Sequence, residues 1–192
     1  MIQTMPREYD RTKATASLIV KQAVEDGLNA VIVCPTGVIG PYDFRGSSMG
    51  ELIHDFSQSH VHMLVEGAYD FVDVRDVAKG HRLALEKGGC GEVYILSGYQ
   101  VGLLELKEMV QHMLGFTSPA IKIPLKLANN VADMATIYYR YAKKQPKFTR
   151  YALETVQSNS AISNQKAKCE LGYSTHALLT TIEDTVKWWQ CE

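Results

Sequence analysis

The sequence predicts an α/β fold, with a parallel sheet in the first part of the chain and a mostly helical C-terminal lobe. Short apolar runs alternate with segments of helical periodicity, in the order helix, strand, helix, strand, helix. That order is typical of a parallel sheet covered by helices. Beyond about residue 115, segments of helical spacing dominate. The two observations together give the fold class.

The first two predicted elements are a helix and a buried strand. Residues 9–26 place apolar or small side chains at helical spacing, and the pattern stops at Gly27. The apolar, largely β-branched run Ala30–Cys34 ends at Pro35. A run of this kind after a helix suits a parallel strand that is buried on both faces. We therefore expect Cys34 to lie inside the protein.

Two further strand and helix pairs follow a loop rich in glycine and proline, residues 36–48. A short helix begins near Met49, and residues 68–89 run from a short strand directly into a helix that ends at two glycines. Residues 92–98 form the next strand. The helix over 103–115 has an apolar stripe at helical spacing.

The remainder of the chain reads as a helical lobe. The segments with helical spacing are Leu125–Lys144, Thr149–Gln157, Asn164–Leu171 and Leu178–Trp189. The boundary between the two parts falls at residue 115, which gives one domain over 1–115 and a lobe over 116–192. The aromatic side chains of the lobe are expected to pack in its core, and they are Tyr138, Tyr139, Tyr141, Phe148 and Tyr151.

Composition and charge exclude several classes of protein. With 46% hydrophobic and 21% charged residues, the 192-residue chain suits a globular protein with a core. Twenty basic and 21 acidic residues give a net charge of -1, so no basic excess is available for a nucleic-acid partner. No stretch approaches the ~18 apolar residues of a membrane span. The four scattered cysteines predict reduced thiols and a cytoplasmic protein.

A tyrosine and a lysine lie one helical turn apart near the start of the chain. Tyr9 and Lys13 have the spacing i, i+4, so both side chains leave the same face of the predicted helix. A nearby ammonium group favours the phenolate, which prepares a tyrosine for general acid/base chemistry. Tyr139 and Lys143 have the same spacing, but in an aromatic and cationic helix end, where packing and solvation explain them.

The loop after the first predicted strand is the second candidate site. In a parallel sheet, ligands bind beyond the carboxyl ends of the strands. Thr36, Gly37 and Val38 follow directly after such an end, and a glycine lets the backbone approach a ligand closely. The alternative interpretation is a plain turn between the strand and the loop. The Tyr9 and Lys13 pair earlier in the chain favours the ligand site over this alternative.

The succession of these motifs resembles the second half of an extended short-chain dehydrogenase/reductase, from the NAD-dependent epimerase/dehydratase superfamily. The resemblance spans about residues 5 to 115 and rests on YDRTK, VIVCPTGVIGP, YDFVDVRDVAKGHRLALEKG and EVYILSG. The dihydroflavonol-reductase-like branch is the most similar one. The resemblance implies a partial Rossmann-type parallel sheet, made of the C-terminal strands and helices of that NAD(P)-binding domain, with substrate-loop insertions and a helical substrate-binding lobe.

The resemblance also implies roles for individual residues. Tyr9 would be the general acid/base, and Lys13 would bind the nicotinamide ribose of NAD or NADP. The loop Pro35–Val38 would pack on the nicotinamide. Phe44, Tyr69 and Arg75 would contact a small-molecule substrate.

Tyr69 favours a reductase of small ketones or aldehydes. It stands where related sugar-nucleotide epimerases often carry an arginine, and a neutral phenol holds phosphate poorly. A nucleotide-sugar epimerase or dehydratase is the alternative enzyme, and a truncated remnant without catalysis is the alternative class.

The family's glycine-rich GxxGxxG turn does not occur in these 192 residues. The resemblance therefore predicts a fragment without the dinucleotide-binding half, which leaves the choice between NAD and NADP open. We expect a homo-oligomer or an N-terminal partner chain to cover the apolar stripe of the first helix.

Two other features have structural interpretations. His60 and His62 would share one face of a strand, but no third ligand is evident, so we expect no metal. Asp76 precedes a helical segment and is expected to be its N-terminal cap.

Overall fold

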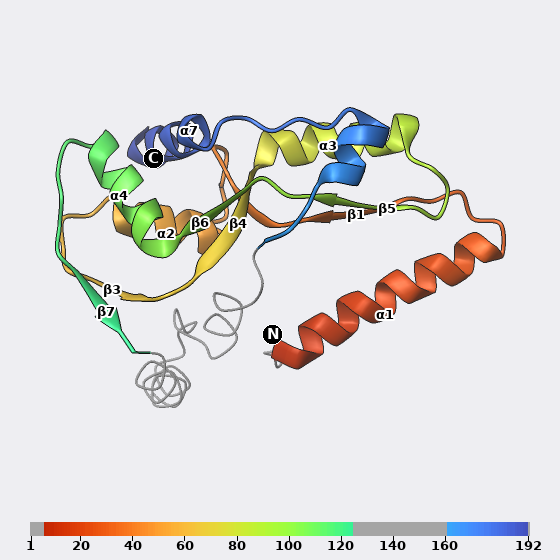
Figure 1. The fold of residues 1–192 in the computed structure, drawn as a ribbon, viewed down its shortest axis with the longest axis horizontal. Helices are drawn as coiled ribbons and strands as arrows, with labels where there is room; N and C mark the ends of the chain where they lie inside the picture. Colours follow the sequence, from red (N-terminus) through yellow and green to blue (C-terminus); the bar gives the residue numbers. More distant parts are fainter. Residues whose placement is uncertain (1–5, 125–160, 192) are drawn as a thin grey trace.

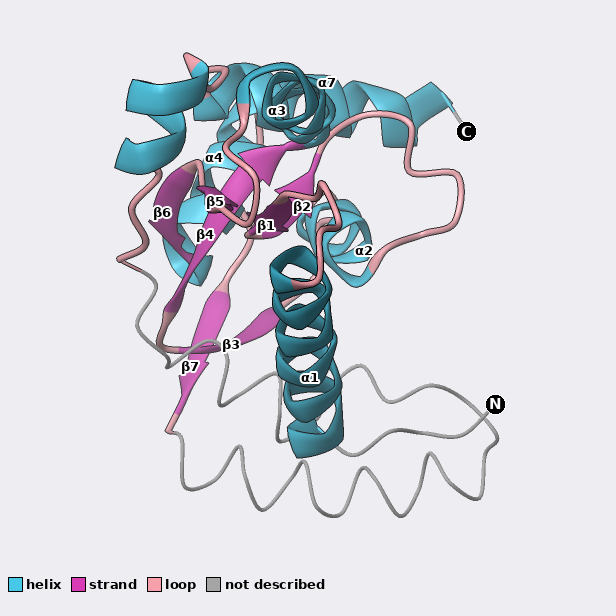
Figure 2. Cartoon of the chain, turned by 90° about the vertical axis from the view of Figure 1, so that its right-hand side faces the viewer, coloured by secondary structure: helices cyan, strands magenta, loops and turns pink. Residues whose placement is uncertain are grey.

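A computed structural model describes residues 6–124 and 161–191, and Figure 1 shows their arrangement. Its helices are α1 (Pro6–Glu25), α2 (Ser48–Phe56), α3 (Val74–Lys87), α4 (Leu103–Met113), α7 (Leu178–Cys191) and a short π-helix, η1 (Ala167–Leu171). Its strands are β1 (Ile32–Pro35), β2 (Gly37–Ile39), β3 (His62–Val65), β4 (Ala68–Asp73), β5 (Val93–Leu96), β6 (Tyr99–Gly102) and β7 (Ala120–Ile123). Helices α3 and α7 lie on one side of the central strands, and α1 lies on the other (Figures 1 and 2).

The strands form three small sheets, mostly parallel as predicted. Strands β1 and β5 pair in parallel, as do β2 with β4 and β3 with β7. Strand β6 departs from the prediction because it runs antiparallel to β4. Only Ser97 and Gly98 separate β5 from β6, although the two strands belong to different sheets. The mixed α/β class is confirmed.

The helices follow the predicted order within the described residues. The ranges predicted for α1, α2, α3, α4 and α7 agree with the structure to within a few residues. The predicted helix over 164–171 contains η1. The two helices predicted for 125–144 and 149–157, and the aromatic series from Tyr138 to Tyr151, lie outside the described residues.

One helix cap was predicted at the wrong residue. Asp73, with φ -68° and ψ 134°, is the cap of α3, and its carboxylate accepts a hydrogen bond from the backbone N–H of Arg75. Asp76 lies inside the first turn of the helix, where its buried carboxylate contacts another segment. Strand β4 continues directly into α3, so the cap is the last residue of the strand, three positions earlier than expected.

Four short strands escaped the sequence prediction, namely β2, β3, β6 and β7. Each has three or four residues, which is too few for a period-two pattern to stand out. Strand β2 lies inside the segment 36–48, which we predicted to be a loop. Gly37 is the first residue of this strand, and the position favours glycine because a Cβ there would lie 2.9 Å from the backbone oxygen of Asp70.

Two apolar clusters form the core. The larger one joins α2, α4 and α7 over the β2–β4–β6 sheet, and it includes Ile53, Phe56, Leu106 and Ile182. The second lies between α3, η1 and strands β4 and β5, around Tyr94 and Leu96. Cys34 is exposed, which corrects the expectation that both faces of β1 are covered. Among the described helices, none is both long and apolar enough to cross a membrane.

Candidate functional site

The predicted tyrosine and lysine pair lies on one face of α1. The Lys13 Nζ atom lies 5.6 Å from the centroid of the Tyr9 ring, within the range of a cation–π contact. Both side chains are exposed. The i, i+4 geometry expected from the sequence is therefore present, because a continuous helix spans both residues.

The body of α1 carries an exposed apolar stripe. Leu18 is 67% exposed and Ile19 is 64% exposed, as the sequence predicted for this helix. Near the end of the helix, Val24 packs against Gly91, whose φ of 79° suits glycine. Within the described residues, Leu18 and Ile19 are therefore left largely uncovered. Figure 2 shows α1 extending away from the other helices.

The carboxyl ends of β1 and β5 meet at a buried carboxylate of β4, that of Asp70. The Thr36 hydroxyl donates to the Oδ1 atom of Asp70 at 2.6 Å, and the Gly98 N–H donates to the same oxygen at 2.9 Å. The Thr36 N–H donates to the Leu96 carbonyl at 3.2 Å. Asp70 thus ties together the two segments that follow β1 and β5, at the edge where parallel sheets bind ligands.

The predicted nicotinamide loop is more constrained than the sequence suggested. Gly37 and Val38 pair with Phe71 and Val72 in the β2–β4 ladder. The Thr36 N–H and hydroxyl already have protein acceptors, so neither is an open donor. Pro35 is exposed at the end of β1, which leaves its ring accessible beside this strand end.

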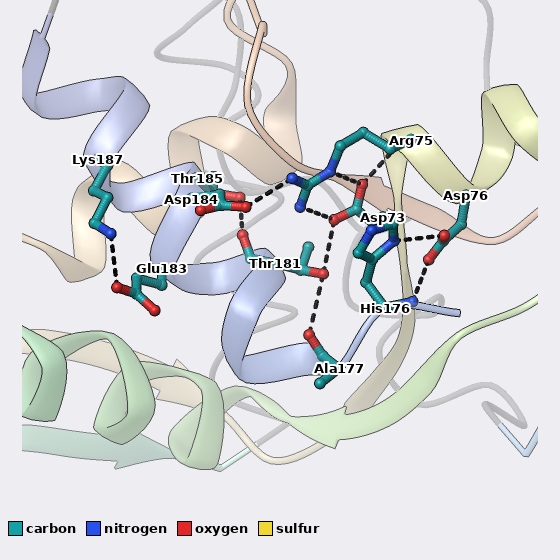
Figure 3. Close-up of polar contacts among 10 residues, drawn as sticks. All are labelled: Asp73, Arg75, Asp76, His176, Ala177, Thr181, Glu183, Asp184, Thr185 and Lys187. Atoms are coloured by element: carbon teal, nitrogen blue, oxygen red, sulfur yellow. Dashed lines mark hydrogen bonds and ion pairs between the residues drawn. The ribbon is translucent and has the colours of Figure 1, made fainter. Parts of the chain in front are cut away.

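Arg75 is held by two carboxylates in Figure 3. Its Nε and Nη2 atoms donate to Asp73 at 2.9 and 2.6 Å, and its Nη1 atom donates to Asp184 of α7 at 2.7 Å. Hydrogen bonds to Asp73 are the main cause that raises the pKa of Arg75. This double ion pair places Arg75 between α3 and α7. The predicted substrate contact of Arg75 stays a prediction.

Asp73 is the buried centre of this network. Burial alone would raise the pKa of its carboxyl group, but hydrogen bonds from Arg75 and Thr181 hold the pKa below its usual range. The Thr181 hydroxyl donates to Asp73 Oδ2 at 2.8 Å. One residue therefore caps α3, binds Arg75 and anchors α7 (Figure 3).

Asp76 makes the second contact with the C-terminal segment. Its carboxylate accepts hydrogen bonds from the His176 N–H at 2.7 Å and from its Nδ1 atom at 2.6 Å. Tyr173 lies nearby and is buried. Burial, followed by the charges of Asp76, Asp70 and Asp73, raises the pKa of Tyr173, so its phenol stays protonated.

The other two predicted substrate residues lie in different places. Tyr69 is half-buried in β4, opposite Val101, with its ring 5.7 Å from that of Phe71. Phe44 is exposed in the loop before α2, and its ring packs edge-on against Trp188 of α7 at 4.8 Å. It lines a shallow groove of about 570 Å³ with Asp43, Glu51, His54 and Trp189.

Comparison with known proteins now gives this fold a family. A model of the NAD dependent epimerase/dehydratase family matches residues 4–97, the part that holds α1 and the strand ends. The chain belongs to the NAD-dependent epimerase/dehydratase family. This confirms the resemblance found in the sequence.

Individual relatives support the same assignment. Sterol demethylase protein B of Methylococcus capsulatus is 29% identical over 185 residues, which cover 95% of this chain and 56% of that protein. A Synechocystis protein provisionally named dihydroflavonol 4-reductase is 27% identical, over 95% of this chain and 54% of its own. The crystal structure of gox2253 superposes with a TM-score of 0.77 at 33% identity, over 95% and 56% of the two chains. This epimerase/dehydratase family member spans about half the length of the curated relatives it matches.

The sequence offered one signal that we did not use. Asp70, Asp73 and Asp76 lie three residues apart in a strand and helix start whose other residues, apart from Arg75, are apolar or aromatic. Buried acidic groups at regular spacing need donors from elsewhere in the fold. Their donors, Thr36, His176 and Thr181 among them, are distant in the sequence, so spacing alone could not name them.

Proposed function

We propose that this chain carries the catalytic pair of an NAD- or NADP-dependent reductase of small ketones or aldehydes. The observation that supports it is the Tyr9 and Lys13 pair on α1, with the lysine Nζ 5.6 Å from the tyrosine ring, in the part of the chain that matches the NAD-dependent family. Tyr9 is the general acid/base of this proposal, and Lys13 binds the nicotinamide ribose.

The proposed step reduces a carbonyl group to an alcohol. The Tyr9 hydroxyl donates its proton to the carbonyl oxygen of the substrate. A bound nicotinamide would supply the hydride that forms the new C–H bond at the carbonyl carbon. The Lys13 ammonium stabilises the phenolate that Tyr9 becomes, since the two side chains share one face of α1.

The carboxyl end of β1 suits a bound cofactor because it exposes a proline ring. Pro35 is exposed there, and it offers an apolar surface to a nicotinamide ring. The same proposed contact with the cofactor includes Thr36, Gly37 and Val38. It would use backbone groups on the side of β2 that does not face β4.

Positions 69 and 75 bear on the choice between a reductase and a sugar-nucleotide epimerase, because a cation there could hold a phosphate group. Tyr69 is neutral, and the guanidinium of Arg75 is occupied by Asp73 and Asp184. A nucleotide diphosphate would therefore find no free cation at either position. The Synechocystis relative, which is named as a dihydroflavonol 4-reductase, points in the same direction.

A Tyr9→Phe exchange tests the proposal in the enzyme purified with any accompanying chain. We expect kcat for ketone reduction to fall about 100-fold or more, because general acid catalysis contributes at least that factor. The dissociation constant for NAD(P)H should stay unchanged. Tyr139→Phe is the matched control, since Tyr139 and Lys143 share the spacing of Tyr9 and Lys13. Full turnover in Tyr9→Phe would refute the assigned mechanism.

The exposed stripe of α1 is the proposed contact with a second copy or with an N-terminal partner chain. Its two large side chains, Leu18 and Ile19, are mostly exposed. We place the enzyme in the cytoplasm, where its free cysteines at 34, 90, 169 and 191 stay reduced.

A further inference from the structure

Three metal-ligand side chains meet where α2 ends and β3 begins. Asp55 lies in the last turn of α2, His60 lies in the connecting turn, and His62 is the first residue of β3. One possible ligand atom of each lies within 4.8 Å of the other two. The sequence prediction of no metal considered the two histidines alone, because Asp55 belongs to a neighbouring helix.

The separations are close to those that one ion imposes. The His60 Nε2 atom lies 3.6 Å from Asp55 Oδ1, and the His62 Nε2 atom lies 3.8 Å from Asp55 Oδ2. Ligand atoms about 2.1 Å from a tetrahedral Zn²⁺ ion are about 3.4 Å apart. For these two pairs, the side chains therefore need to move only a few tenths of an ångström.

The two imidazole rings lie against each other beside the Asp55 carboxylate. They stack with a centroid separation of 4.3 Å and an interplanar angle of 28°. Both Nε2 atoms face the same carboxylate group. An ion between these nitrogens and the carboxylate would have two exposed ligands, His60 and Asp55, so water can complete its coordination.

His62 has the outer support that a metal-binding histidine usually has. Its side chain is 1% exposed, and its Nδ1 atom lies 3.2 Å from the Ser118 hydroxyl. Ser118 in turn accepts a hydrogen bond from the Gln111 Nε2 atom at 2.8 Å. A partner on the second ring nitrogen fixes the orientation of a ligating imidazole.

In the free protein, the His62 Nε2 atom lies 2.9 Å from the Asp55 carbonyl oxygen and donates to it, since a carbonyl only accepts. Metal binding through Nε2 requires the neutral ring to carry its proton on Nδ1, where the Ser118 hydroxyl oxygen can accept it, and one coordinate bond replaces the hydrogen bond to Asp55.

We propose that Asp55, His60 and His62 form a surface site for a divalent transition-metal ion of the Zn²⁺ type. Two imidazoles and one carboxylate suit such an ion, whereas Mg²⁺ and Ca²⁺ prefer oxygen ligands. The site is separate from the proposed reduction, since it uses neither Tyr9 nor Lys13. Its presence or absence leaves the proposed function untouched.

Calorimetric titration of the untagged chain with Zn²⁺ tests the site. The four exposed cysteines are alkylated first, because thiolates would compete for this ion. We expect one equivalent of Zn²⁺ to bind, and Mg²⁺ to give no heat. His60→Ala and Asp55→Ala should each weaken Zn²⁺ binding about 10-fold or more, since even outer contacts contribute that much.

His81→Ala is the matched control. His81 is an exposed histidine on α3 with its Nδ1 atom 2.8 Å from the Val77 carbonyl, and it lies outside the cluster. Its variant should bind Zn²⁺ as the parent does. Three results would each overturn the proposal. They are the absence of binding at submillimolar Zn²⁺, equal Zn²⁺ binding by His60→Ala and the parent, and an equal loss of Zn²⁺ binding in His81→Ala. The test uses variants of the two exposed ligands, Asp55 and His60, so the buried His62 need not be changed.

Discussion

At the scale of single residues, buried acids organise this chain. Asp70, Asp73 and Asp76 are all buried, and each accepts at least two hydrogen bonds. A buried carboxylate without such donors would be strongly destabilising. Their donors come from the segments after β1 and β5, from α3, and from the approach to α7 and its first turns.

Replacing Asp73 with asparagine should destabilise the fold. The exchange removes the charge that holds Arg75 and Thr181, so we expect the free energy of unfolding at pH 7 to fall by about 2 to 4 kcal/mol. Urea denaturation followed by circular dichroism measures it. Since the folded state lowers the pKa of Asp73 below 3.8, its contribution is present above that value and is lost as the pH falls through the folded pKa. The difference between parent and variant should therefore narrow at pH 3.

Asp184→Asn is the control, because Asp184 binds the same guanidinium group through a different nitrogen atom. The Asp184 side chain is about one-third exposed, so its loss should cost less than about 1 kcal/mol. Equal effects of Asp73→Asn and Asp184→Asn would show that burial does not set the strength of this network.

At the scale of elements, α1 differs from the other helices. Helices α2, α3, α4 and α7 each bury one face in the core, whereas α1 leaves Leu18 and Ile19 exposed. Figure 1 shows it running apart from the other helices, on the far side of the β1–β5 pair from α3. The hydrophobic effect therefore favours a further surface against this helix.

Charges placed on the stripe of α1 should reduce self-association. We expect the double variant Leu18→Glu, Ile19→Glu to sediment as a smaller species than the parent in analytical ultracentrifugation. Leu85→Glu is the control, because Leu85 is 83% exposed on α3 as a single apolar side chain. Identical sedimentation of the parent and the double variant would argue against α1 as a contact surface.

At the scale of the whole molecule, the C-terminal helix completes the core that begins about 140 residues earlier. Ile182 and Val186 of α7 pack with Ile39 and Ile53 in one cluster. The Asp73 and Asp76 contacts hold this end of the chain in place (Figure 3). Residues 161–191 are thus part of the same folded unit as the first strands.

A shorter side chain at position 182 should show that the stability of the whole fold depends on α7. Ile182 is fully buried, so Ile182→Ala should lower the free energy of unfolding by about 2 to 5 kcal/mol. Differential scanning calorimetry should show one transition at a lower temperature, because both halves share the core. Leu179→Ala on the exposed face of α7 should change stability by less than about 0.5 kcal/mol. Two separate transitions, with only one shifted, would contradict a single unit.

The sequence was most informative where one pattern is long and continuous. The helices α1, α3 and α7 have 14 or more residues, which is enough for helical spacing to be read. It was least informative for β2, β3, β6 and β7, which are short and lack the apolar run that marked β1, and for the cap of α3, which is shared with β4. At the site, the Tyr9 and Lys13 pair was predictable because both residues lie on one helix.

The sequence by itself determined the α/β class, the family motifs and the geometry of the Tyr9 and Lys13 pair, since each depends on neighbours along the chain. Only the tertiary structure decided that Arg75 is bound by two carboxylates, that Cys34 is exposed, and that Asp55 joins His60 and His62. Such contacts depend on packing between segments distant in sequence, and local periodicity contains no information about them.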